Sequence, residues 1–183
     1  SLPQDYPHGN MCTSPFKKAL QPMYHLTIET PEDWWEVEAL YDLCFAPGRE
    51  ALSSYRLRDN ALPQVELCHV ARDAEGILAG AIRYWPVRVG DHKALLLGPV
   101  AVHPTRQGEG LGRELIETTL EIAARLHWSR VMLVGDANYY NKFGFACLDR
   151  VVMPPPINPK RVLGRAVEPN AWNGVMGKVI RLD

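Results

Sequence analysis

Hydrophobic and polar positions in the first third of the chain switch from a period of two to a helical period. Residues 24–28 alternate like a strand. Thr30, Pro31 and the acidic Asp33 then form the pattern of a helix N-terminus, and apolar residues recur at helical spacing as far as Cys44. After a Pro-Gly break, a shorter helical stretch covers residues 49–57. This part of the chain therefore predicts one strand followed by two helices.

The middle of the chain predicts three strands joined by tight turns. The strands are expected over residues 64–72, 77–89 and 94–102, with turns of Asp, Glu and Gly residues between them. The third run is almost wholly apolar, which indicates a strand buried on both faces in the middle of a sheet. Hairpin connections make these three strands antiparallel.

The second half predicts a helix, a strand, a short helix and a last strand. Residues 110–126 form an amphipathic helix pattern, followed by a buried strand over 130–134 and a short helical piece over 139–142. A proline-rich connection then leads to a strand over 174–181. The expected fold class is α/β in the broad sense (α+β): a mixed, largely antiparallel central sheet flanked by helices. We expect an extended arm over residues 1–22 and a single domain over 23–183.

The composition and charge of the chain exclude several classes of protein. The chain has 183 residues, of which 46% are hydrophobic and 22% charged, which is typical of a globular protein. Its net charge of -1 predicts no strong attraction to nucleic acid or to an anionic membrane. No run approaches the ~20 apolar residues of a membrane span, and the first residues lack a secretory pattern. We expect a cytoplasmic protein with neither nucleic-acid nor membrane partners; a homodimer stays an open option.

The cysteines and histidines do not predict a metal site. Cys12, Cys44, Cys68 and Cys147 are far apart and form no CxxC pair, and the six histidines form no HExxH motif. Unclustered cysteines usually behave as small buried hydrophobic residues. We therefore expect no metal and treat all four cysteines as structural.

A glycine-rich loop over residues 107–112 is the strongest candidate for chemistry. It lies between the apolar strand and the amphipathic helix. Gly108, Gly110 and Gly112 have no Cβ, so backbone N–H groups can approach a phosphate closely, and the helix N-terminus adds its positive dipole end. The arrangement is typical of a pyrophosphate cradle, although such glycines also serve simply to make tight turns.

Two other phosphate sites fit this loop less well. In a Rossmann dinucleotide site, Asp136 would have the spacing of a ribose-binding acid, but the glycine turn would directly follow the strand, whereas residues 103–106 intervene here. Hairpin-linked strands also precede the loop. A P-loop would need a Lys-Ser or Lys-Thr pair after the glycines, and the sequence has neither there.

Three motifs together resemble the GNAT superfamily of N-acyltransferases. Gln107-x-x-Gly110-x-Gly112 is similar to the family's pyrophosphate motif Q/R-x-x-G-x-G/A. The segment 100–104, Val-Ala-Val-x-Pro, resembles the end of the family's fourth strand, and Tyr140-x-x-x-Gly-Phe resembles its downstream tyrosine and Gly-Phe pair. The order of elements also matches, so the resemblance spans residues 24 to 181.

This resemblance implies an acetyl-CoA-dependent N-acetyltransferase whose fourth and fifth strands splay apart. The acetyl group would pass directly to a primary amine of a small-molecule or peptide acceptor; the alternative is a noncatalytic acyl-CoA-binding module on the same fold. The pantetheine arm would lie in the splay. The cofactor-binding residues that the resemblance implies are Val100, Ala101, Val102, Gln107, Gly108, Glu109, Gly110, Leu111, Gly112, Arg113 and Asn138.

The resemblance makes Tyr140 the candidate acid that protonates the departing thiolate. A phenol with a pKa near 10 is protonated at neutral pH. Tyr139 and Tyr140 are adjacent, so in a helix the two side chains face different ways. The structural alternative for Tyr140 is a packed core aromatic.

The proton acceptor is less evident, because the strand over 94–102 contains no Asp or Glu. Asp136 follows the fifth strand and is the candidate base, although an aspartate there commonly caps the next turn. His103 is expected to be a loop residue, and a water chain could also take the proton. The family often has an asparagine seven residues before the tyrosine; Leu133 stands there, so Asn138 or Asp136 would supply that contact to the cofactor.

The sequence does not identify the acceptor. Trp34, Trp35, Tyr84 and Trp85 could line an acceptor pocket, but aromatic residues at helix and strand positions more often lie in the core.

Overall fold

A central sheet of nine strands organises the fold, as the computed structural model of residues 23–45, 53–59 and 61–182 shows. The predicted arm over residues 1–22 lies outside these described residues. In spatial order the sheet contains β1 (Tyr24–Ile28), β2 (His69–Asp73), β3 (Leu78–Val89), β4 (His92–Val102), β5 (Arg130–Val134), β8 (Val162–Ala166) and β6 (Ala146–Cys147). The strand β9 (Gly177–Arg181) pairs with the end of β3 and with β7 (Val151–Val152). Pairs along the main path are antiparallel except β4 with β5, which confirms the predicted mixed, largely antiparallel sheet.

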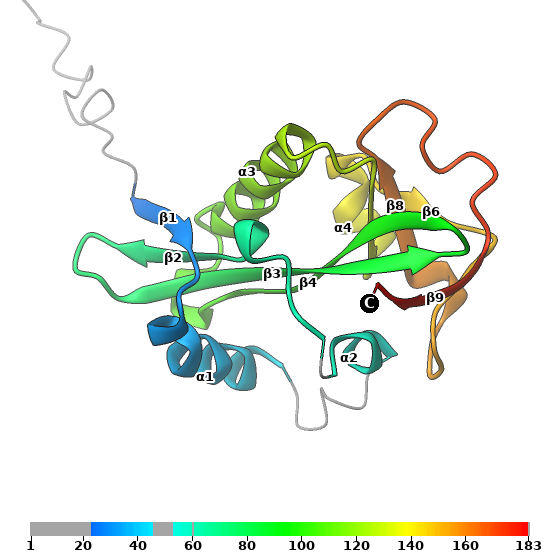
Figure 1. Cartoon of the computed structure of the whole chain (residues 1–183). Helices are drawn as coiled ribbons and strands as arrows, with labels where there is room; N and C mark the ends of the chain where they lie inside the picture. Colours follow the sequence, from blue (N-terminus) through cyan, green and yellow to red (C-terminus); the bar gives the residue numbers. More distant parts are fainter. Residues whose placement is uncertain (1–22, 46–52, 60, 183) are drawn as a thin grey trace, which may run out of the picture.

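Helices cover both faces of the sheet (Figure 1). On one face lies α3 (Leu111–Arg125), and on the other lie α1 (Trp34–Cys44) and α2 (Ser53–Arg58); α4 (Ala137–Tyr140) follows β5. The predicted apolar face of α3 is buried against the sheet through Leu111, Leu115, Ile116, Leu120 and Ala123. The sheet is thus the middle layer, and the ends of β4 and β5 meet the starts of α3 and α4.

Several predicted boundaries were wrong. The strand expected over 64–72 begins only at His69, because Val65–Leu67 forms a 3₁₀ turn in which Cys68 N–H donates to the Val65 carbonyl at 3.1 Å. The helix expected over 49–57 is α2, whose predicted start falls outside the described residues. The strands β6, β7 and β8 were not predicted; β6 and β7 have two residues each.

A β-bulge interrupts the pairing of β3 and β4. Two residues of β4, Gly98 and Pro99, lie opposite Arg83 alone. The indole N–H of Trp85 donates to the Gly98 carbonyl at 2.7 Å, and the Tyr41 hydroxyl donates to the Pro99 carbonyl at 3.2 Å. Because both bulge carbonyls accept side-chain hydrogen bonds, the sheet can depart from regular pairing there without leaving these groups unsatisfied.

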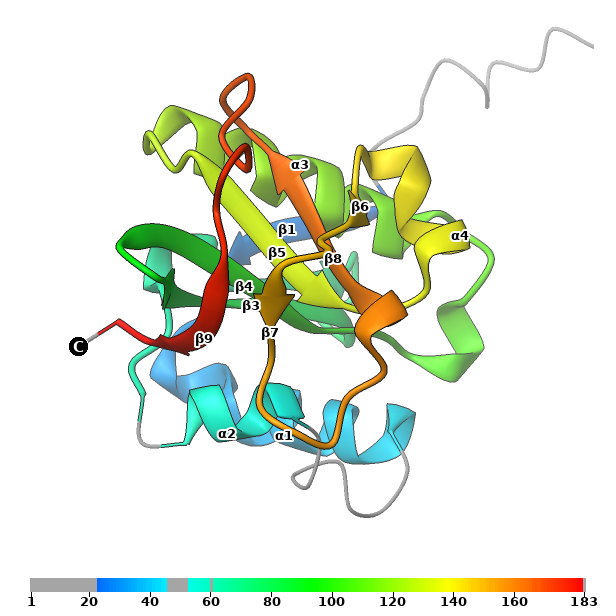
Figure 2. The same cartoon turned by 90° about the vertical axis from the view of Figure 1, so that its right-hand side faces the viewer.

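The fourth and fifth strands of the path separate soon after they meet. Their parallel pairing is confined to Leu95 with Val131 and Leu96 with Met132. All five residues of β5 pair with β8 on its other side (Figure 2). From Leu97 onward β4 therefore has one edge without a strand partner in the described part of the chain, and the predicted splay is present.

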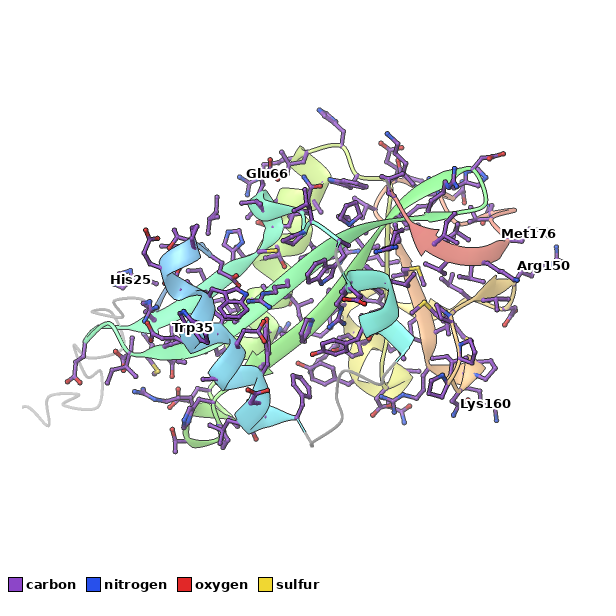
Figure 3. The ribbon with its side chains drawn as sticks, turned by 60° about the horizontal axis from the view of Figure 1, so that its bottom comes forward. His25, Trp35, Glu66, Arg150, Lys160 and Met176 are labelled. Atoms are coloured by element: carbon purple, nitrogen blue, oxygen red, sulfur yellow. The ribbon has the colours of Figure 1, made fainter. Side chains whose placement is uncertain are left out.

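Some residues expected in the core are exposed. Trp35 on α1 is 77% exposed and points away from the sheet (Figure 3), and Trp34 is also exposed. Tyr84 and Trp85 are buried as expected. Cys147 lies at the surface, which corrects its assignment as a buried residue. In the described ranges, no helix has the length and apolar character that a membrane crossing requires.

Candidate active site

The glycine loop has the backbone conformation that an anion cradle requires. Gly108 and Gly110 have φ values of +85° and +80°, in the left-handed region that favours glycine. A Cβ at either position would meet no atom within 4 Å, so the space in front of the loop is open. Gly110 is also the N-cap of α3, and the first helical bond runs from the Glu114 N–H to its carbonyl. The N–H groups of residues 111–113 thus have no acceptor within the helix and are available to an anion.

Side chains from the first two strands brace the loop. An ion pair joins Arg106 Nη2 to Asp73 Oδ2 at 2.6 Å, and the Tyr24 hydroxyl donates to the Glu109 carboxylate. Gln107 Nε2 donates to the Val102 carbonyl at 3.5 Å. Because the Glu109 side chain is bound to Tyr24, any contact of this residue with a cofactor would come through its backbone.

Three further residues of the predicted site form the start of α3. A Cβ on Gly112 would lie 3.4 Å from the Tyr139 hydroxyl and 3.6 Å from Val102 Cγ2, so β4, α3 and α4 come close together at this position. Arg113 lies at the exposed surface, where its Nε contacts Glu117 Oε1 at 2.9 Å. The leucine between the other residues of the motif, Leu111, is buried in the core, so only its backbone can face a ligand.

A cavity of about 140 Å³ lies where β4 and β5 separate. Its walls come from α2, from the bulge of β4, from the end of β5 and from α4. The described lining residues are Phe45, Ser54, Tyr55, Arg58, Leu97, Gly98, Pro99, Val100, Leu133, Val134 and Tyr140. This set contains two phenols, those of Tyr55 and Tyr140, and one guanidinium, but no carboxylate and no imidazole.

Tyr140 lies in this cavity with its ring fixed by neighbours. The ring packs against Phe143 and Phe145, and a Cβ on Gly135 would lie only 2.6 Å from Tyr140 Cε2. Within the described residues its hydroxyl has no hydrogen-bond partner. Burial raises the pKa of Tyr140 to about 12, so the phenol is protonated at neutral pH and can donate a proton. Tyr139 is 38% exposed and faces elsewhere, as the sequence predicted for adjacent helical residues.

The remaining predicted site residues do not line the cavity. Asp136 is exposed, and its Oδ1 accepts from the Asn138 backbone N–H at 3.0 Å, which is the capping role that the sequence left open for it. Asn138 is also exposed. His103 caps the next turn by accepting from the Thr105 N–H at 3.1 Å. The structure thus brings Val100 and Tyr140 together and leaves Asp136 and Asn138 outside.

Sequence reasoning missed the bulge and two residues of α2, Tyr55 and Arg58. A glycine and a proline in the middle of an apolar strand, Gly98-Pro99, are the local signal that could have predicted the bulge. No local signal marks the α2 residues, because they become part of the site only through tertiary packing. Among the described residues, no group of three or more His, Cys, Asp or Glu side chains could hold a metal ion.

Comparison with known proteins agrees with this geometry. The family model described as "Acetyltransferase (GNAT) family" matches residues 32–145. The "Uncharacterized N-acetyltransferase YhbS" of Escherichia coli strain K12 is 30% identical over 122 residues, which cover 66% of this chain and 72% of that protein. The crystal structure of Escherichia coli YhbS in complex with CoA superposes with a TM-score of 0.75 at 26% identity, covering 87% of this chain and 90% of that one. A GNAT family acetyltransferase from Brucella melitensis in complex with acetyl-CoA gives 0.66 at 27% identity, covering 87% and 96%.

Proposed function

Because the chain belongs to the acetyltransferase (GNAT) family, we propose that it transfers the acetyl group of acetyl-CoA directly to a primary amine of a small-molecule or peptide acceptor. One observation carries this proposal. The unpaired edge of β4 connects the anion cradle at the start of α3 with the cavity that holds Tyr140. Solved relatives in complex with CoA and acetyl-CoA support the choice of cosubstrate.

The proposed binding of acetyl-CoA uses mainly backbone groups. The free N–H groups of residues 111–113 would hold the pyrophosphate, since the φ-positive glycines leave the front face of the loop open. The pantetheine amides would add to the free edge of Val100, Ala101 and Val102 as an extra strand does. Asn138 stays a predicted cofactor contact, because its exposed position beyond β5 neither requires nor opposes it.

The proposed chemistry uses Tyr140 as the proton donor. As the amine attacks the acetyl carbonyl and the C–S bond breaks, the phenol would give its proton to the departing sulfur. A backbone N–H of the β4 edge would stabilise the charge that develops on the carbonyl oxygen. The proton lost by the amine would pass to solvent water, because the described cavity residues include no carboxylate or imidazole. The Asp136 carboxylate lies outside the cavity and accepts a hydrogen bond from the Asn138 backbone N–H.

Binding and turnover test this proposal separately. Calorimetry should show CoA and acetyl-CoA binding with a Kd of about a micromolar or tighter, and no binding of NAD. Incubation with acetyl-CoA and a broad panel of amines should then release free thiol in an acceptor-dependent manner. NAD binding without CoA binding would exclude the proposed cradle.

The alternative of a noncatalytic acyl-CoA-binding module is favoured by one observation, the lack of a side-chain base among the described lining residues. The two functions predict different results in the same assay. CoA binding without thiol release for any amine would identify the binding module, whereas acceptor-dependent release would identify the enzyme.

A further inference from the structure

Arg58 is a partly buried cation in the wall of the cavity, and the described residues offer it no carboxylate. Its Nε and Nη1 atoms are buried and have no hydrogen-bond partner, and no ion pair to this guanidinium occurs within residues 23–45, 53–59 and 61–182. Leaving a charged group buried and unpaired is costly, so native proteins normally pair such groups. The position of Arg58 therefore requires an explanation other than core stability.

Arg83, on the neighbouring strand β3, shows how this protein satisfies a buried arginine. Its Nε contacts Glu29 at 3.0 Å and its Nη1 contacts Glu38 at 2.7 Å. Both guanidinium groups lie on the side of the sheet that faces α1 and α2, but among the described residues only Arg83 has carboxylate partners. Within the described part of the chain, Arg58 therefore has no carboxylate and is open to an anionic ligand in the cavity.

The Arg58 guanidinium is held in a defined place. Its Cζ lies 4.3 Å from the centre of the Tyr55 ring and 6.0 Å from that of Trp85. A Cβ on Gly98 would lie 3.1 Å from Arg58 Nη2, so the guanidinium packs against the bulge of β4. Burial lowers the pKa of Arg58 to about 10, which leaves the group positively charged at neutral pH. A fixed positive charge in a cavity is suited to recognise an anion rather than to move a proton.

We propose that Arg58 binds a carboxylate of the amine acceptor, so that the acceptor is a small amino acid or a similar aminocarboxylate. The inference rests on the proposed acetyl transfer and specifies its substrate class. Val100 and Tyr140, which flank the reacting thioester in that proposal, line the same cavity as Arg58. The amine and the carboxylate must therefore lie close together in one small molecule. Charge-assisted hydrogen bonds from the guanidinium to that carboxylate would also orient the acceptor.

Matched acceptors test this proposal directly. Amino acids and their C-terminal amides carry the same amine and side chain but differ in the carboxylate, and their rates are compared at equal concentrations of the unprotonated amine. For the parent protein, kcat/KM from free-thiol release should be at least about tenfold higher for the acids, as expected of one charged pair. In Arg58→Gln that preference should disappear through a loss on the acids alone.

Two further variants serve as controls. Arg125→Gln removes an exposed arginine at the far end of α3, whose contact with Glu121 measures 3.7 Å, and it should keep the preference. Arg58→Lys retains the charge but not the paired donors, and it should recover part of the preference. Circular dichroism and CoA calorimetry establish that each variant is folded. A preference that survives in folded Arg58→Gln overturns the proposal.

A second arm identifies the source of the carboxylate. The same chemistry could belong to the acyl chain of a thioester, so succinyl-CoA is compared with acetyl-CoA on a neutral amine. Equal dependence on Arg58 for both donors supports the acceptor assignment. An Arg58-dependent preference for succinyl-CoA, with no discrimination between acids and amides, overturns it.

A binding experiment tests the role of Arg58 without requiring catalytic turnover. With CoA present, N-acetyl amino acids should raise the Tm of the parent but not that of Arg58→Gln, and N-acetyl amino acid amides should raise neither. If CoA binds and no amine is acetylated, the enzyme proposal fails while this arm still decides the role of Arg58. If amines are acetylated and the acids bind no better than the amides, only the Arg58 proposal fails.

Discussion

The hydroxyl of Tyr140 can be removed with little effect on the fold. In Tyr140→Phe the ring keeps its contacts with Phe143 and Phe145, and the tight fit against Gly135 is unchanged. Since the hydroxyl has no hydrogen-bond partner in the described residues, its loss leaves no neighbouring group unsatisfied. The free energy of unfolding, measured with urea, should change by no more than about 0.5 kcal/mol.

The effect on catalysis should be much larger. General acid catalysis contributes roughly 10²–10⁴-fold to a rate, which corresponds to about 2.7–5.4 kcal/mol at 1.36 kcal/mol per factor of ten. The pKa of about 12 means that the Tyr140 phenol stays protonated across the ordinary assay range. At pH 9, three units lower, only about one molecule in a thousand would carry the ionised side chain. The parent should therefore show no loss of rate from ionisation of this residue up to that pH.

Steady-state kinetics with a responsive amine and saturating acetyl-CoA would measure the drop in kcat. Single-turnover experiments would show whether chemistry limits the rate, and calorimetry should find an unchanged Kd for CoA. Tyr139→Phe is the matched control, because it removes the same group from the adjacent, more exposed residue. Its kcat should stay within about threefold of the parent.

The outcome that refutes this reasoning is a kcat within about threefold of the parent for Tyr140→Phe, with chemistry limiting turnover. The raised pKa would then reflect burial of a core aromatic and nothing more. A drop in Tyr139→Phe instead would move the proton donor to that residue. In either case the family assignment would stand.

Three other changes probe the loop, the core charges and the pH dependence. Gly110→Asp places a Cβ and a negative charge in the open face of the loop, so calorimetry should show a Kd for CoA that is at least about tenfold weaker. The control Gly76→Asp, in a hairpin turn with a similar φ, should leave the Kd for CoA unchanged. Arg83→Met leaves the carboxylates of Glu29 and Glu38 without their guanidinium, and it should lower the free energy of unfolding, measured with urea, by about 3–5 kcal/mol. A loss below about 1 kcal/mol would contradict the importance of these ion pairs for stability. His69 is buried with an unpaired Nδ1, and burial lowers its pKa. Below about pH 6.5 the unfolded chain therefore binds a proton at this residue more readily than the folded protein does. Stability should fall as the pH is lowered from 7 to 5, and His69→Leu should flatten this slope in urea titrations at several pH values.

Elements with a strong local signal could be predicted from the sequence. The amphipathic pattern of α3 and the glycine at its start are properties of neighbouring residues, and the structure has them where they were expected. The turn between β2 and β3 is similar, because the Gly76 N–H donates to the Asp73 carbonyl at 3.0 Å. The β8 strand gave no comparable signal, since its pairing with β5 rather than its five-residue pattern makes it a strand.

The candidate site likewise contains residues that the sequence could predict and residues that it could not. The backbone conformation of the glycine loop could be predicted because the positive φ of Gly108 and Gly110 is a property of these residues themselves. The ring of Tyr140 could be assigned only by resemblance, and its fixed orientation depends on Gly135. Arg58 could not be predicted, because its burial depends on a bulge in β4 that lies 40 positions further along the chain. Local patterns contain no information about such contacts.

The cavity walls come from segments that are far apart in the sequence, and this separation would allow acceptor choice to evolve independently of cofactor use. Substitutions within the six residues of α2 alter the wall that holds Tyr55 and Arg58, while the backbone of the 107–113 loop is untouched. Under the proposed function, a gene duplicate could acquire a new amine acceptor through substitutions in one short helix and retain its acetyl donor. For the engineer, a library restricted to residues 54, 55 and 58 would sample the polar positions of that wall at little risk to donor binding.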